Sequence, residues 1–191
     1  MRVILSEEIW SFDLSAALAE ISPQRREQAL KFRHELGQRL CVLAYQLLKR
    51  ALSEEYGLTE NPLFEYNEHG KPSIVGHPEI CFNLSHCREA VICAVDNRPI
   101  GVDVESVRSY KDSLVRYTMD ADEVQQIESA GDPAMAFIRL WTKKEAALKL
   151  SGTGISKDMK QVLHAEGLKF ETFVDSRQRY VWSVCQFADE N

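Results

Sequence analysis

The stretch "IGVDVESV", residues 100–107, carries two acidic residues within an otherwise apolar strand pattern. Residues two apart in a β-strand project to the same side, so Val102 and Val104 can face a core. Asp103 and Glu105 then stand together on the opposite face. Two neighbouring carboxylates repel one another unless a cation lies between them. A solvated sheet edge and a divalent-cation site are therefore the two interpretations of this stretch.

The segments around this strand predict further strands and helices. "RVILS" (2–6), "ICFNLSHC" (80–87) and "AVICAV" (90–95) predict strands, and "DNRP" (96–99) predicts a hairpin turn into the acidic strand. "LKFETFVD" (168–175) and "RYVWSVCQF" (179–187) predict a closing pair. The residues from 67 to 79, "NEHGKPSIVGHPE", predict a turn-rich loop.

Helix signals lie on both sides of the acidic strand. Ser22 before Pro23 predicts an N-cap, and leucines spaced by four and three predict a second helix that ends near Gly57. "DADE" (120–123) fits a capping box, and a longer helix is expected from "DPAMAF" to Gly152. The order of strand, helices and strands thus occurs twice. We expect an α+β fold of two similar α/β halves, 1–99 and 100–191, with a pseudo-twofold relation; a single α+β sheet is the alternative.

Composition limits the class of protein. The chain has 191 residues, 45% of them hydrophobic, and no apolar run of membrane-spanning length, so we expect a soluble, cytoplasmic protein. The net charge of −6 disfavours nucleic acid as a partner, although residues 21–50 hold seven basic residues against two acidic ones. The five cysteines follow no zinc or disulfide spacing, and we expect reduced, packed thiols.

A second cluster of functional side chains is predicted on the long helix "FIRLWTKKEAALKLSG", residues 137–152. Steps of four residues place Trp141, Glu145 and Lys149 along one stripe. The simpler interpretation is an i,i+4 ion pair on a solvated helix. Glu145 could instead complete a magnesium site with the two strand carboxylates, and Lys149 would then point at phosphates. Lys71 in "GKP" and the pair Ser85 and His86 in "NLSHC" are candidate ligand contacts, with turn surface and core packing as the alternatives.

Taken in order, "GKP", "FNLSHC", "IGVDVE" and "FIRLWTKKEAALKLSGTGI" resemble the surfactin-synthetase-type 4′-phosphopantetheinyl transferases. The resemblance spans about residues 25 to 155. It implies transfer of the phosphopantetheine arm of coenzyme A to a serine of an acyl or peptidyl carrier protein, with release of 3′,5′-ADP. It also implies an active site in a cleft between two halves. Because two halves in one chain could build a whole site without a partner, we expect a monomer.

The resemblance implies a role for each matching residue. The catalytic residues would be Glu145, as base for the carrier serine, and Lys149, which would also contact the phosphates. The magnesium ligands would be Asp103, Glu105 and Glu145. The 3′-phosphorylated adenosine end of coenzyme A would be bound by the N-terminal half, through Arg39, Lys71, Ser85 and His86. Arg25 is a candidate for a further phosphate contact.

Two other functions fit parts of the same pattern. A magnesium-dependent hydrolase of coenzyme A or related phosphate esters would use the same carboxylates with water as the nucleophile. A non-enzymatic module would bind coenzyme A or a carrier protein without turnover. The three carboxylates count against the module, because a pure binder has no need to face a pyrophosphate with negative charge.

Overall fold

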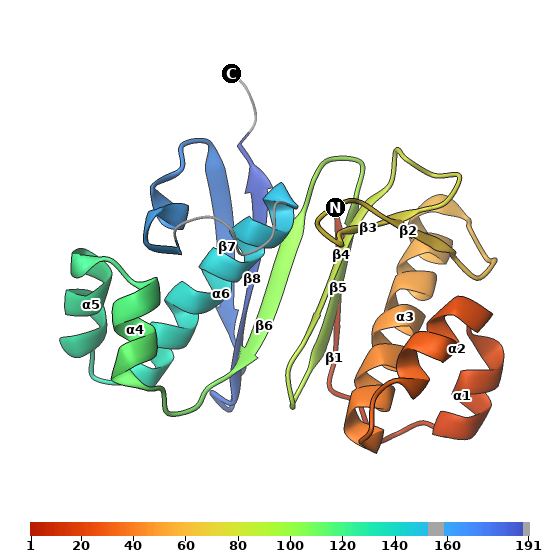
Figure 1. Ribbon diagram of the computed structural model, residues 1–191, viewed down its shortest axis with the longest axis horizontal. Helices are drawn as coiled ribbons and strands as arrows, with labels where there is room; N and C mark the ends of the chain where they lie inside the picture. The colour runs from red at the N-terminus through yellow and green to blue at the C-terminus, as the bar shows by residue number, and fades with distance from the viewer. Residues whose placement is uncertain (153–158, 189–191) are drawn as a thin grey trace.

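The computed structural model describes residues 1–152 and 159–188, so the end of the quoted helix motif, residues 153–155, lies outside the described residues. Two three-stranded antiparallel sheets form its centre (Figure 1). The first has the order β1 (Arg2–Ser6), β5 (Val91–Asp96) and β4 (Cys81–His86). The second has the order β6 (Gly101–Ser106), β8 (Tyr180–Phe187) and β7 (Leu168–Val174). The mixed helix and strand content confirms the expected α+β class; the pseudo-twofold relation stays a prediction.

Helices cover the outer sides of the two sheets (Figure 1). On the first sheet lies α3 (Glu35–Tyr56), flanked by α1 (Leu14–Glu20) and α2 (Pro23–Leu30). On the second lies α6 (Pro133–Ser151), with α4 (Asp112–Thr118), α5 (Ala121–Glu128) and the 3-10 helix η2 (Met159–His164). No helix in the described ranges combines the length and apolar character that crossing a membrane requires.

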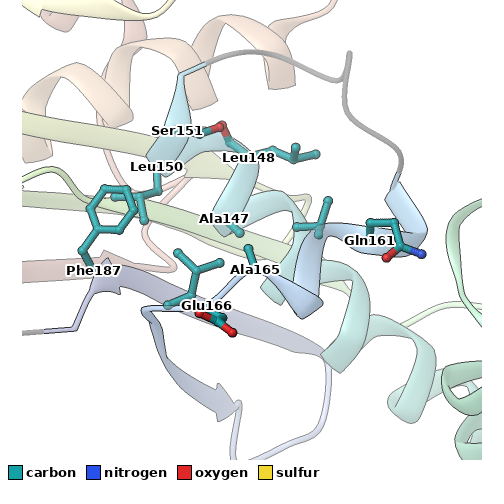
Figure 2. Close-up of a pocket in the computed structure, with 10 residues that line it drawn as sticks. Ala147, Leu148, Leu150, Ser151, Gln161, Ala165, Glu166 and Phe187 are labelled. Carbon is teal, nitrogen blue, oxygen red and sulfur yellow. The ribbon is translucent and has the colours of Figure 1, made fainter.

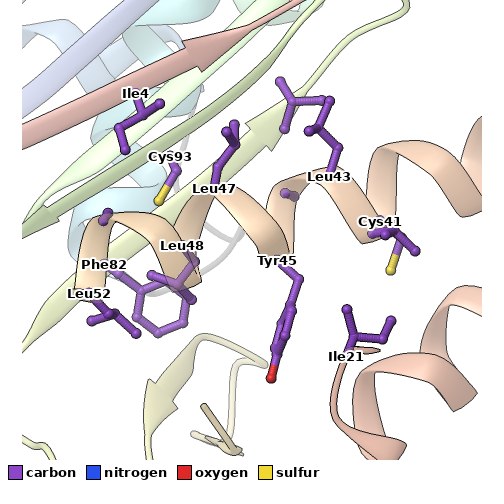
Figure 3. Close-up of a cluster of buried hydrophobic side chains, with 14 of the residues drawn as sticks. Ile4, Ile21, Cys41, Leu43, Tyr45, Leu47, Leu48, Leu52, Phe82 and Cys93 are labelled. Atoms are coloured by element: carbon purple, nitrogen blue, oxygen red, sulfur yellow. The ribbon is translucent and has the colours of Figure 1, made fainter. Parts of the chain in front are cut away.

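Strand β5 is buried on both faces, which explains why its sequence shows no polar alternation. Cys93 belongs to the core beneath α3, where Figure 3 shows Leu48 of the helix beside Phe82 of the first sheet. Ile92 and Ala94 face the other way, into a cluster that includes Val102, Val104, Tyr180 and Val184 of the second sheet. The layers therefore run from α3 through the two sheets to α6, and the acidic strand faces this inner core with its valines, as predicted.

The predicted hairpin between β5 and β6 is wrong. β5 pairs with β1 and β4, whereas β6 pairs with β8, so the 96–99 turn carries the chain from one sheet to the other. β4 and β6 are both edge strands, and side chains rather than a backbone ladder connect them. The N–H of Val102 donates to Asn83 Oδ1 over 2.9 Å, and the N–H of Val104 donates to Ser85 Oγ over 3.3 Å.

Most predicted helix ends are confirmed by their caps. Ser22 Oγ accepts from the N–H of Arg25, Asp120 and Glu123 form the capping box, and α3 ends at Gly57 with a φ of 68°. The loop expected at residues 67–79 instead begins inside a small hairpin, β2 (Phe64–Tyr66) with β3 (Pro72–Ile74). All five cysteines are free thiols, as expected.

Gly101 sets the distance between β6 and α6. A Cβ at this position would lie 2.0 Å from the carbonyl oxygen of Ala146 and 2.6 Å from the backbone nitrogen of Leu150. Both atoms belong to the helix backbone, which cannot move aside as a flexible side chain would. Glycine therefore permits the close approach of the strand that carries Asp103 to the helix that carries Glu145 and Lys149.

We expect Gly101→Ala to lower the free energy of unfolding by about 1–3 kcal/mol or more, because the added methyl group forces β6 and α6 apart. Gly131→Ala is the matched control: a Cβ there meets no atom of the described residues within 4 Å, and the change should stay within about 1 kcal/mol. Urea unfolding of both variants measures the difference. Equal stabilities would show that β6 and α6 do not need this close contact.

Candidate active site

Asp103 is the most buried acidic residue of the predicted site, with 3% of its surface exposed. Strand β6 directs it away from the valine core and toward α6. Its Oδ1 atom accepts hydrogen bonds from Lys149 Nζ over 2.6 Å and from Ser85 Oγ over 2.8 Å. Its Oδ2 atom is also buried but accepts no hydrogen bond from the described part of the chain. One carboxylate oxygen is thus satisfied and the other can still coordinate a ligand.

The hydroxyl group of Ser85 links three elements. It donates to Asp103 in β6, and it accepts from Lys149 Nζ in α6 over 2.9 Å and from the Val104 N–H. A hydroxyl group has one hydrogen to donate and two lone pairs, so these three bonds use its full capacity. The structure therefore brings together Ser85, Asp103 and Lys149, and it gives Ser85 a positioning role beside the predicted ligand contact.

Glu105 and Glu145 flank this cluster, from β6 and α6. Burial raises the pKa of both side chains, and the charge of Asp103 raises each pKa further. Lys149 acts in the opposite direction on both, and for Glu105 the pKa is also held down by Arg108 and by a hydrogen bond from Trp141. The solvated-edge interpretation of the acidic strand does not fit these surroundings.

Glu105 and Glu145 both lie within electrostatic range of Asp103, but the three carboxylates do not form a ready-made metal cage. Across residues 1–152 and 159–188, no group of three or more His, Cys, Asp or Glu side chains is arranged to hold a metal ion. The ammonium group of Lys149 contacts Asp103, which was predicted to be a magnesium ligand. The donor set still suits magnesium, because hard carboxylate oxygens are its usual protein ligands and the buried Asp103 Oδ2 has no hydrogen-bond partner among the described residues.

A cleft of about 280 Å³ opens beside the cluster, and both halves of the chain line it. Lys71 and Asn83 come from the first half, and Glu145, Lys149 and Gly152 from the second. Lys71 reaches across to donate to the carbonyl oxygen of Leu150 over 2.8 Å, and burial lowers its pKa. The predicted contact residue Lys71 therefore lies beside α6, although it is 79 positions away from Leu150.

His86 and Arg25 lie on the first-half side of the cluster. His86 lies at the end of β4 and keeps contact with solvent. Partial desolvation of its ring lowers its pKa, and the positive charges of Lys149 and Arg25 lower it further. Arg25 donates to the carbonyl oxygen of Cys41 from Nε over 3.2 Å and from Nη2 over 3.0 Å. These bonds fix α2 on α3 and hold a positive charge within range of His86.

Arg39 is held by the N-terminal loop. It pairs with Glu35 over 2.8 Å, donates to the carbonyl oxygen of Phe12 over 2.8 Å, and stacks over the rings of Trp10 and Phe12. No contact in the described ranges joins it to Asp103, Ser85 or Lys149. The structure thus gives Arg39 a packing role, and its predicted role toward coenzyme A stays a prediction.

A larger cavity of about 390 Å³ lies between the end of α6, η2 and the β7–β8 sheet (Figure 2). Among the described residues around it, Glu166 alone is charged, and most of the others are alkyl or aromatic side chains. Its described lining therefore has one carboxylate and no lysine or arginine, whereas phosphoryl chemistry needs several charged groups. The smaller cleft beside Asp103 is the better candidate for the active site.

Known proteins match this chain over most of its length. A family model for the 4′-phosphopantetheinyl transferase superfamily matches residues 99–188. The 4′-phosphopantetheinyl transferase psf-1 of Bacillus pumilus is 35% identical over 139 residues, 71% of this chain and 60% of the relative. The 4′-phosphopantetheinyl transferase Sfp of Bacillus subtilis (strain 168) is 30% identical over 153 residues, 77% of this chain and 68% of the relative.

The chain belongs to the 4′-phosphopantetheinyl transferase superfamily. The stretch that matches the superfamily model contains Asp103, Glu105, Glu145 and Lys149, so the site built on β6 and α6 lies within it. The chain spans about three fifths to two thirds of the length of the curated superfamily members named above.

Sequence reasoning missed three features of this superfamily member's site. Asn83 was part of a quoted motif without a role, yet it binds the backbone of β6 and lines the cleft. The Leu150 carbonyl group is the partner of Lys71. Lys144, beside Glu145, is fully buried: its Nζ lies 2.8 Å from Glu123 Oε2 and donates to the Met159 carbonyl oxygen over 2.7 Å. The i+2 alternation of "NLS" could have indicated that Asn83 and Ser85 face the same neighbour.

The raised pKa of Glu145 predicts a pH-dependent stability. The folded chain holds this proton more tightly than the unfolded chain, whose carboxyl group has the ordinary pKa of 4.5, so unfolding releases it. The wild type should therefore lose stability relative to Glu145→Gln as the pH rises from about 4.5 through the raised folded pKa. Thermal unfolding of both proteins between pH 4 and pH 8 measures this gap.

Glu7→Gln is the control of opposite sign, because hydrogen bonds from Arg179 and Tyr180 lower the pKa of Glu7. Its carboxylate stabilises the fold above the unfolded pKa, and that contribution is lost as the pH falls through the lowered folded pKa. Glu7→Gln should thus be less stable than the wild type at neutral pH and approach it in acid. A Glu145→Gln curve that follows the same direction would contradict the effect of burial on Glu145.

Proposed function

We propose that this protein transfers 4′-phosphopantetheine from coenzyme A to a serine of an acyl or peptidyl carrier protein and releases 3′,5′-ADP. The observation that carries the proposal is that Asp103 and Glu105 of β6 interact with Glu145 and Lys149 of α6, and that the latter two line a cleft. Membership of the superfamily gives this arrangement its chemistry, because the relatives named above are 4′-phosphopantetheinyl transferases.

The cleft suits a substrate that carries both a pyrophosphate and a 3′-phosphate. Residues 1–99 would bind the 3′-phosphorylated adenosine end, through Lys71, His86 and the more distant Arg25 and Arg39. Residues 100–191 would bind the pyrophosphate. Several cations around one concave site are what a polyphosphate ligand requires. Because one chain supplies both walls of the cleft, we propose that it acts as a monomer.

Asp103, Glu105 and Glu145 would hold magnesium, which would supply charge neutralisation at the pyrophosphate oxygens. Glu145 accepts the proton of the carrier serine as the serine oxygen forms its bond to the phosphorus that bears pantetheine. The bond from that phosphorus to the bridging oxygen breaks, and 3′,5′-ADP leaves with the electron pair. A carboxylate held beside the reacting atoms can accept this proton directly or through one water molecule.

Lys149 has two roles in this scheme. Its ammonium group holds Asp103 in place through the 2.6 Å contact, and its position on the wall of the cleft lets it contact phosphate oxygens. A lysine ammonium is a compact point charge on a flexible stem, so it can exchange a carboxylate partner for a phosphate partner. In the transfer step Lys149 stabilises the charge that develops on the departing 3′,5′-ADP.

Incubation with coenzyme A, magnesium and an apo carrier protein should add one phosphopantetheine group to the carrier, read by intact-mass spectrometry. A chelator should prevent the gain. Glu145→Gln should lower the transfer rate by about a hundredfold or more, because the proton acceptor is removed. Glu128→Gln, an exposed position in α5, is the matched control and should retain the wild-type rate.

The assay should include several acyl and peptidyl carrier proteins, because the residues that line the cleft do not identify the carrier. Full transfer by Glu145→Gln would remove Glu145 from the mechanism. Consumption of coenzyme A without any gain of carrier mass would favour the hydrolase instead, with water in place of the serine.

A further inference from the structure

Lys149 contacts Asp103, one of the carboxylates that would hold the divalent cation in the proposed function. Its Nζ atom lies 2.6 Å from Asp103 Oδ1 and donates to Ser85 Oγ over 2.9 Å. We propose that Lys149 is the resident counter-charge of Asp103 and that it competes with the divalent cation for this carboxylate. The metal ion then binds tightly only together with coenzyme A, whose pyrophosphate offers Lys149 a new partner. This inference rests on the proposed function.

The burial of Asp103 makes a counter-charge necessary. A carboxylate that is 3% exposed loses most of its hydration, and its charge must be balanced by hydrogen bonds or by a cation. In this structure the balance comes from Lys149 and from the Ser85 hydroxyl group, both on Oδ1. Both partners use the same oxygen atom, and Oδ2 accepts no hydrogen bond from the described residues and can still coordinate a metal ion.

A divalent ion that approaches this carboxylate meets the ammonium group at close range. Two cations a few ångströms apart repel each other strongly in a partly buried site, where water screens them poorly. The metal ion would bind more tightly if Lys149 moved away. The Lys149 side chain is 29% exposed and lines the cleft, so its ammonium group can turn toward a ligand there without unfolding α6.

Coenzyme A supplies the driving force for that exchange. Its pyrophosphate brings negative charge to the cleft wall, where it can accept hydrogen bonds from Lys149 and coordinate the metal ion at the same time. Each partner then makes the binding of the other more favourable, and this coupling must be reciprocal. Free enzyme should thus bind the metal ion weakly, and the complex with coenzyme A should bind it tightly.

The test is the binding of Mn²⁺ in the absence of carrier protein, measured by the electron paramagnetic resonance signal of the free ion. Without coenzyme A, Lys149→Met should bind Mn²⁺ about tenfold more tightly than the wild type, because the competing charge is gone. Lys149→Arg keeps the charge and should remain weak. Lys143→Met removes the same charge from the same helix and should behave as the wild type.

Addition of coenzyme A should tighten Mn²⁺ binding to the wild type more than to Lys149→Met. If Lys149→Met is poorly stable, the rise of its melting temperature with Mn²⁺ gives the same information, and it should exceed the rise in the wild type. The inference would be overturned if Lys149→Met bound Mn²⁺ no more tightly than the wild type does. This holds even if the wild type modifies carrier proteins, so the two outcomes can be told apart. A tenfold gain without any carrier modification by the wild type would overturn the proposed function alone.

Discussion

The packing of the two sheets and the geometry of the candidate site both depend on the contact between the edge strands β4 and β6. β4 and β6 face each other without a shared backbone ladder, and Asn83 and Ser85 satisfy the N–H groups of Val102 and Val104. An edge strand with open N–H groups is a liability in most proteins. Here two short polar side chains pair with it, and one of them also binds Asp103. The Ser85 hydroxyl group therefore both joins β4 to β6 and fixes the central carboxylate of the site.

The second constraint is the contact of β6 with α6. Because Gly101 lets the helix backbone approach the strand, side chains that lie two residues further along β6 come within reach of α6. Asp103 meets Lys149 directly, and its charge raises the pKa of Glu105 and Glu145. Three carboxylates and a lysine thus share a partly buried space in which screening by water is weak. Electrostatic coupling among these groups is a consequence of the packing.

Local signals predicted the elements well, because caps and periodicity act within a few residues. The serine cap at Ser22, the capping box from Asp120 and the glycine stop at Gly57 are all confirmed. The predicted hairpin at residues 96–99 failed for a physical reason: turn residues reverse the chain, but they do not choose which strand edge it joins. The continuous apolar sequence of β5 is typical of a strand that is buried on both faces, as observed. It does not predict which elements cover those faces.

In the site, too, neighbours within one strand or helix could be predicted from the sequence, whereas contacts between elements could not. Alternation placed Asp103 beside Glu105, and the four-residue helical step placed Glu145 beside Lys149, so each pair was visible in the sequence. The contact of Lys149 with Asp103 spans 46 positions, and that of Lys71 with Leu150 spans 79. No local rule predicts such contacts.

Two adjacent residues of α6, Lys144 and Glu145, lie in different surroundings. Lys144 points inward, where it is fully buried between Glu123 of α5 and the carbonyl group of Met159 in η2. Glu145, the next residue, lines the cleft. Breaking a buried ion pair is costly because the remaining charge has no water to solvate it, so Lys144 resists rotation of the helix about its axis. The anchored lysine thereby holds the adjacent glutamate in the cleft, which links the stability of the second half to the geometry of its proposed base.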